Sequence, residues 1–135
     1  MCRIMANYKR GIMTMKENSI GDSEYKLMEI IWDYAPVASG DLSSICEMVH
    51  GWKKTTVYTM LKRLQDKGFI KSEKSTITFL VGRDELQKQQ SEELVEKNFK
   101  GSLPMFVNAF LGGGKKMSKE DAAKLIDMIE EHTEE

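Results

Sequence analysis

Hydroxyl-bearing and basic side chains crowd into a short stretch near the middle of the chain, over residues 54–63. Apolar residues recur there at three- and four-residue spacing, which predicts an amphipathic helix over about residues 54–67. The expected inward face carries Val57, Met60, Leu61 and Leu64. The opposite face then offers Lys54, Thr55, Thr56, Tyr58, Thr59, Lys62 and Arg63. Threonine hydroxyl and methyl groups suit phosphates, base edges and the thymine methyl group, and Lys and Arg suit phosphates and guanine. This face predicts contact with double-stranded DNA.

The distribution of charge is informative although the net charge is only −1. Residues 53–74 hold seven basic and two acidic residues, a net +5, whereas residues 118–135 hold two basic and seven acidic residues, a net −5. Such segregation suggests that one end of the chain faces an anion and the other does not. Taken alone, the charges are equally consistent with two solvated helix faces.

The elements before the central helix must position it. A helix is expected from Asp22 or Ser23, either of which can cap it, to just before Pro36, which stops it. Its apolar stripe is Leu27, Ile30, Ile31 and Tyr34. A short extended stretch, Val37-Ala38, leads to Ser39, which is expected to cap a second helix over residues 40–49. The inward side chains of that helix are Leu42, Ile45, Cys46 and Val49.

A β-hairpin is expected after Gly68, which suits the left-handed end of the central helix. The turn falls near Ser75, and Ile77, Phe79 and Val81 alternate with Thr78 and Leu80. The order of helix, extended segment, helix, turn, helix and hairpin predicts a winged helix-turn-helix over residues 21–82. Lys71 and Lys74 would then sit on the wing, and we add Ser39 to the expected DNA contacts.

A helical segment is expected over residues 83–135. Asp84 would cap a helix to about Lys100, a short apolar helix follows over residues 103–111, and Ser118 opens the last helix. The apolar stripe on residues 84–100 is too thin to close a core with the two short helices that follow. Pairing with a second copy of the chain is therefore expected to bury the apolar side chains of these helices. The expected interface comprises Leu94, Val95, Phe99, Met105, Phe106, Phe110, Leu125, Ile126 and Ile129. The fold class is therefore mainly α with a small β wing, an α+β winged helix followed by a dimerisation region.

The sequence resembles the BlaI/MecI-type penicillinase repressors from about Ser23 to the C-terminus. The matching stretches are Trp32-Asp33, Val37-Ala38, Thr55-Thr-Val-Tyr-Thr-Met-Leu-Lys-Arg-Leu64 and Lys67-Gly-Phe-Ile70. The resemblance implies a homodimeric transcriptional repressor that reads a palindromic operator. It also implies relief of repression when a membrane-bound sensor metalloprotease triggers cleavage between an asparagine and a phenylalanine in the short apolar helix.

The corresponding stretch departs from that pattern, because Ala109 separates Asn108 from Phe110. Two modes of relief therefore stay open, cleavage in this region and binding of a small effector. A third interpretation of the whole chain is a winged helix that binds protein instead of DNA. A copper-responsive branch of the family has a cysteine-rich tail, whereas this chain has no cysteine after Cys46.

Several classes of protein are not expected. No apolar run approaches the ~18 residues of a membrane span, and no secretory signal is recognisable, so a cytoplasmic protein is the default. Cys2 and Cys46 show no pairing or ligand spacing, and His50 and His132 lack a partner at metal spacing. We expect neither a metal nor another cofactor, and no enzyme activity, since no nucleophile and base occupy a defined motif. Residues 1–20 lack periodicity and are expected to form a disordered tail, with Met13 or Met15 as alternative starts.

Overall fold

The computed structural model describes residues 19–134, so most of the expected N-terminal tail lies outside the described part. The chain divides into two compact units, the first ending at Gln90 and the second beginning at Ser91. The sequence predicted a division after Gly82, and that boundary stays a prediction. The two units are described separately below.

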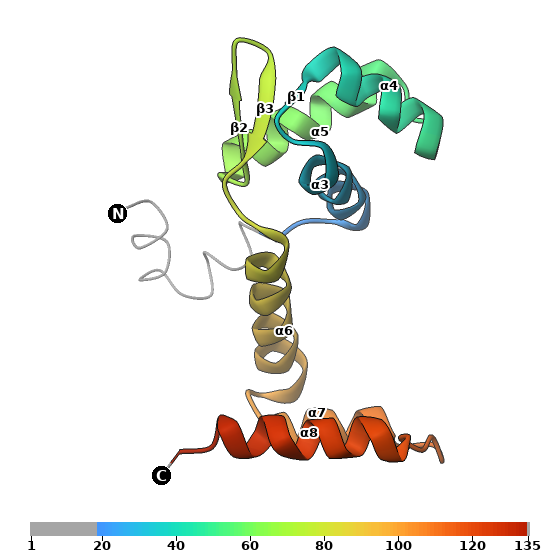
Figure 1. Cartoon of the computed structure of the whole chain (residues 1–135), viewed down its shortest axis with the longest axis vertical. Helices are drawn as coiled ribbons and strands as arrows, with labels where there is room; N and C mark the ends of the chain where they lie inside the picture. The colour runs from blue at the N-terminus through green and yellow to red at the C-terminus, as the bar shows by residue number, and fades with distance from the viewer. Residues whose placement is uncertain (1–18, 135) are drawn as a thin grey trace. The chain divides into compact units, whose positions relative to one another are not determined.

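The first unit has the element order of a winged helix. It contains α3 (Asp22–Tyr34), β1 (Val37–Ala38), α4 (Ser39–His50), α5 (Lys54–Lys67), β2 (Ile70–Glu73) and β3 (Thr76–Phe79). The three strands form one antiparallel sheet in the order β1-β3-β2, so β3 lies in the middle, as Figure 1 shows. The predicted α+β winged-helix class is therefore confirmed.

The core of this unit brings the apolar faces of the three helices against the sheet. Side chains with 2% exposure or less include Leu27, Met28, Ile31, Leu42, Cys46, Val57, Leu64, Ile70, Ile77 and Leu86. Burying one large aliphatic side chain contributes about 1.5–3 kcal/mol, so this cluster is the main source of stability of the unit. Leu86 belongs to α6 (Arg83–Phe99), whose first turns therefore pack as part of the winged helix.

Three predicted helix caps are wrong. Helix α3 is capped at Gly21, whose amide donates to Glu24 Oε1 at 3.0 Å, so Asp22 and Ser23 already lie inside the helix. Helix α4 begins one residue earlier than expected, with Ala38 at the cap position and Ser39 as its first helical residue. Asp84 likewise lies within α6, which starts at Arg83. In each case the backbone turns into the helix one or more residues before the polar residue that the capping rule selects.

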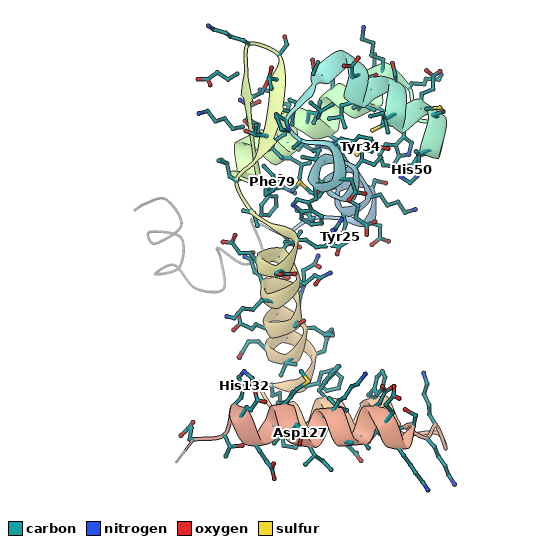
Figure 2. The ribbon with its side chains drawn as sticks, viewed as in Figure 1. Tyr25, Tyr34, His50, Phe79, Asp127 and His132 are labelled. Carbon is teal, nitrogen blue, oxygen red and sulfur yellow. The ribbon has the colours of Figure 1, made fainter. Side chains whose placement is uncertain are left out.

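Two residues expected on inward faces are exposed. Tyr34 is 54% exposed and Val49 59% exposed, and Figure 2 shows Tyr34 near the C-terminal end of α3. Each follows the last fully buried side chain of its helix, Ile31 in α3 and Cys46 in α4, by one turn. Helical periodicity identified the correct stripe, but it carries no information on where along the helix the core ends. Phe79, 42% exposed at the end of β3, lies outside the core in the same way (Figure 2).

The second unit consists of the remainder of α6, then α7 (Leu103–Leu111) and α8 (Lys119–Glu131). Ser118 caps α8 through Asp121, at 3.0 Å between hydroxyl oxygen and amide nitrogen, as the sequence predicted. Phe106 lies 5.4 Å from Phe99 and 6.4 Å from Phe110, measured between ring centroids. No side chain of α7 or α8 is fully buried in the described chain.

A candidate nucleic-acid interface

Helix α5 has one fully buried face and one solvent face. Val57, Met60, Leu61 and Leu64 are at most 5% exposed, which confirms the predicted inward face. Every other residue from Lys54 to Asp66 is exposed, and these include all seven α5 residues predicted to contact DNA. The burial of one face fixes the rotation of the helix about its axis, so the exposed set is presented as a group.

The C-terminal end of α5 is fixed by a left-handed glycine cap and by an ion pair. Gly68 adopts the left-handed conformation with φ 87°, and its amide donates to Gln65 at 3.1 Å. Lys67 Nζ lies 2.9 Å from Glu24 Oε1 and 2.8 Å from the carbonyl oxygen of Ser19, and only 24% of the Lys67 side chain is exposed. The ion pair therefore ties the end of α5 to the start of α3.

The basic residues between positions 53 and 74 are not equally available to an external anion. Lys67 faces the protein and is neutralised by Glu24, and Lys71 lies 3.8 Å from Glu73. Lys54, Lys62, Arg63 and Lys74 form no ion pair with any residue between 19 and 134. Free cations therefore remain on the exposed face of α5 and at the wing tip, where an external anion could neutralise them.

The hydroxyl groups on α5 are not equivalent. Thr59 Oγ1 donates to the carbonyl oxygen of Thr55 at 2.9 Å, so its proton is used within the helix. Thr55 and Thr56 line an open hollow together with Arg63, Ser23 and Trp52. The hollow therefore combines hydroxyl groups, a guanidinium group and an aromatic ring.

Ser23 and Trp52 were not among the predicted DNA contacts. The Trp52 indole packs partly against the core and stacks on His50, with 4.4 Å between ring centroids. Its additional place beside Arg63 depends on the turn between α4 and α5. A tryptophan directly before two lysines was the only signal in the sequence.

The wing is a two-residue hairpin whose tip is joined to α4. Lys74 and Ser75 form the turn, with φ values of 53° and 63°. The amide of Ser39 donates to the carbonyl oxygen of Ser75 at 2.8 Å, and Lys71 and Lys74 are both exposed. Ser39, a predicted DNA contact, is only half-buried and reaches the wing through its backbone.

A family model described as penicillinase repressor matches residues 20–131, which cover both units. The chain belongs to the penicillinase repressor family. This is a family of transcriptional repressors, as the resemblance of the central stretch had implied.

Individual relatives support the same assignment. The chain is 28% identical to the methicillin resistance regulatory protein MecI of Mammaliicoccus sciuri, over 88% of this chain and 94% of that protein. It is 25% identical to the penicillinase repressor of Bacillus licheniformis, over 84% of this chain and 91% of that protein. An uncharacterized 16.5 kDa protein of Latilactobacillus sakei is 37% identical over 46% of this chain, and the match spans 42% of that protein.

The predicted interface residues of the second unit are largely in contact with solvent. Leu94, Met105, Phe110, Leu125, Ile126 and Ile129 are each at least 40% exposed, while Val95, Phe99 and Phe106 are half-buried. Asn108, Ala109 and Phe110 all lie within α7 and are exposed. The apolar helix α7 and the apolar side chains of the amphipathic helix α8 therefore display a hydrophobic surface that residues 19–134 do not cover.

Among residues 19–134, no helix is both long and apolar enough to cross a membrane. No group of three or more His, Cys, Asp or Glu side chains in the same part of the chain is arranged to hold a metal ion. Cys46 is buried in the winged-helix core, where desolvation raises the pKa of its thiol to about 11.

Proposed function

We propose that this protein represses transcription by binding a palindromic operator sequence-specifically, as a homodimer that presents two copies of α5 and the wing. The observation that supports this most strongly is the division of α5 into a buried apolar face and an exposed face of hydroxyl groups and unpaired cations. In a helix-turn-helix protein the corresponding helix enters the major groove. The protein-interaction alternative gives no reason for several unpaired cations to gather on that face.

Each side chain on this surface has a role that its chemistry suits. Arg63 has the planar donor geometry for a bidentate contact with guanine, and Lys54 and Lys62 provide charge for phosphates. The methyl groups of the threonines offer apolar contacts to thymine. Lys71, Lys74 and Ser39 would contact the sugar-phosphate backbone of the DNA next to the major groove. The Tyr58 ring, whose centroid lies 5.7 Å from Lys54 Nζ, would pack on the same backbone. Phosphate contacts position the protein, whereas contacts to base edges select the sequence.

The homodimer is proposed from the second unit. Most of its large apolar side chains on α7 and α8 are exposed in a single chain, and exposed apolar patches commonly mark an interface with another chain. An isologous pair would bury this surface against its own copy and place two reading helices about one DNA turn, ~34 Å, or a multiple of it apart. The proposed division is a DNA-binding domain over residues 21–82 and a dimerisation domain over residues 83–135, in which the first turns of α6 pack on the winged helix through Leu86.

Relief of repression is proposed to act on the second unit. Cleavage near Asn108, triggered by a membrane-bound sensor metalloprotease, would separate α8 and the end of α7 from the rest of the chain. Four of the nine proposed interface residues, Phe110, Leu125, Ile126 and Ile129, lie after Asn108. The three residues Asn108, Ala109 and Phe110 are exposed, which favours access. Mass spectrometry after co-expression with a sensor protease tests this directly. A chain that stays intact while repression is lifted would instead favour relief by a bound effector.

The test of DNA binding uses the protein with its own upstream promoter as a labelled duplex. We expect fluorescence anisotropy to show salt-dependent binding. The logarithm of the association constant should fall linearly with the logarithm of the salt concentration, with a slope near −0.9 per neutralised phosphate. A shuffled duplex of equal length measures the non-specific part. The matched control is Lys119→Gln, which removes a cation from α8 and should leave the slope unchanged. Absence of salt-dependent binding by a folded protein would remove the repressor proposal and leave the protein-interaction module.

A further inference from the structure

The tip of the wing has a backbone conformation that its own residues do not favour. Lys74 and Ser75 both have positive φ, and neither is glycine. The left-handed region costs roughly 1–2 kcal/mol for an ordinary L residue, and two-residue hairpin turns of this kind normally contain Asn, Asp or Gly. A contact from outside the hairpin would offset part of this cost and favour one conformation of the tip.

Strand β1 supplies part of that support. On one side of β3, Ala38 pairs with Thr76, and on the other side Glu73 pairs with the same residue. The hydrogen bond from the Ser39 amide to the Ser75 carbonyl oxygen, 2.8 Å long, continues the β1–β3 ladder by one residue into the turn. The wing is thus attached to a third strand up to its tip.

The donor of this bond is available because of its place in α4. Ser39 is the first helical residue, and the amides of the first helical turn have no acceptor within the helix. The Ser39 amide can therefore donate to the wing without breaking a hydrogen bond of α4. The acceptor, Ser75, is preceded in the turn by Lys74, an exposed cation with no ion pair among residues 19–134.

We infer that the first residue of α4 acts as a clamp on the wing. The backbone hydrogen bond from Ser39 to Ser75 is a positioning contact that holds Lys74 where it meets a DNA phosphate. The wing tip and the helix-turn-helix then bind as one rigid surface, so ordering of the tip does not subtract from affinity. This inference rests on the proposed function, because it assigns the clamp a role in the same DNA-binding surface.

The test uses Ser39→Pro in the full-length chain. Proline lacks the amide hydrogen and is well accepted at the first position of a helix. The preceding residue, Ala38, already has φ −67° and ψ 142°, the conformation that a residue before proline prefers. The substitution therefore removes the clamp with little effect on α4. Ser39→Ala is the matched control, since it removes the hydroxyl group, itself a proposed DNA contact, and keeps the amide. The salt slope of each Lys74→Ala variant is therefore compared only with the slope of its own background, so that any direct loss at Ser39 cancels.

The measured quantity is the change in the salt slope of DNA binding that Lys74→Ala causes in each background. In the unmodified chain, Lys74→Ala should reduce the salt slope by ~0.9 for each half-site. The same reduction is expected in the Ser39→Ala background, and less than half of it in the Ser39→Pro background. A merely structural role for Ser39 would leave the Lys74 contribution the same in all three, and that result would overturn the clamp while the proposed repressor function stands.

A second measurement does not depend on the proline variant. Amide hydrogen exchange, followed by NMR in the unmodified chain, should show the Ser39 amide protected to the same degree as the amides of β3. Exchange at the rate of an unprotected amide would overturn the inference even if Ser39→Pro fails to fold. If the unmodified chain shows no salt-dependent DNA binding, the proposed function fails and the inferred role of the clamp fails with it.

Discussion

Two lysines of the same helix should behave oppositely when their charge is removed. Lys62 is exposed and has no ion pair among residues 19–134, whereas Lys67 is bound to Glu24 and to the carbonyl oxygen of Ser19. We therefore expect Lys62→Gln to weaken DNA binding without lowering stability. Lys67→Gln should lower stability without changing the salt dependence of binding.

The magnitudes follow from the surroundings of each charge. The Glu24 side chain is only 9% exposed. When the Lys67 ammonium group is lost, the Gly21 amide is the hydrogen-bond partner that Glu24 keeps among residues 19–134. A hydrogen bond to a charged group contributes about 1.5–3 kcal/mol, and the 24% exposure of Lys67 keeps the cost below that of a fully buried pair. We expect the free energy of unfolding to fall by about 2 kcal/mol for Lys67→Gln and by less than about 0.5 kcal/mol for Lys62→Gln. The salt slope should fall by ~0.9 per half-site for Lys62→Gln alone.

The assays are urea unfolding and fluorescence anisotropy on the operator duplex over a series of salt concentrations. Glu24→Gln is the matched control, because it removes the same ion pair from the other side and leaves every lysine in place. It should reproduce the loss of stability and leave the salt slope unchanged. A salt slope reduced as much by Lys67→Gln as by Lys62→Gln would refute the assignment of Lys67 to an internal role.

Four further outcomes are expected. Arg63→Ala should weaken operator binding by roughly 1–3 kcal/mol in anisotropy titrations if it reads a guanine, and unchanged affinity would exclude Arg63 from the reading set. Ile126→Asp should convert a dimer to a monomer with little effect on the fold, because Ile126 is 56% exposed in a single chain; an intact dimer in analytical ultracentrifugation would contradict the proposed interface. Leu64→Ala should lower the free energy of unfolding by about 2–5 kcal/mol, since Leu64 is fully buried, and a urea midpoint equal to that of the unmodified chain would contradict the core. The pKa of Cys46, raised to about 11 from 9.0, means that the folded state keeps a proton that the unfolded state loses. Stability should therefore fall between pH 9 and 11, by at most about 1.4 kcal/mol per pH unit, and Cys46→Ala should lack this component in urea unfolding followed against pH.

Local patterns predicted most of the winged helix. The spacing of Val57, Met60, Leu61 and Leu64 identified the buried face of α5, and Gly68 marked its left-handed end, because both depend on short-range geometry. Caps were less reliable. Gly21 and Ala38 occupy cap positions without contributing a capping side chain, so the rule that selects Ser or Asp chose the wrong residues.

Contacts between residues distant in the sequence could not be predicted in this way. The pairing of Lys67 with Glu24 joins residues 43 positions apart. The approach of Ser23 and Trp52 to Arg63 and the bond from Ser39 to Ser75 likewise depend on how three helices and a hairpin pack. A count of charges along the chain treats Lys67 and Lys62 alike, although only Lys62 is free to meet an external phosphate.

Periodicity and residue type are local properties, so they were enough to predict the order of elements, the buried face of α5 and the likeness to the penicillinase repressors. Which basic residues between 53 and 74 lack an internal partner depends instead on how the helices pack. Packing places Glu24 against Lys67 and leaves Lys62, Arg63 and Lys74 without an ion pair among residues 19–134. It also decided that Ser39 meets the wing through its amide, because the strand pairing that brings Ser39 to Ser75 forms only when β1 lies beside β3.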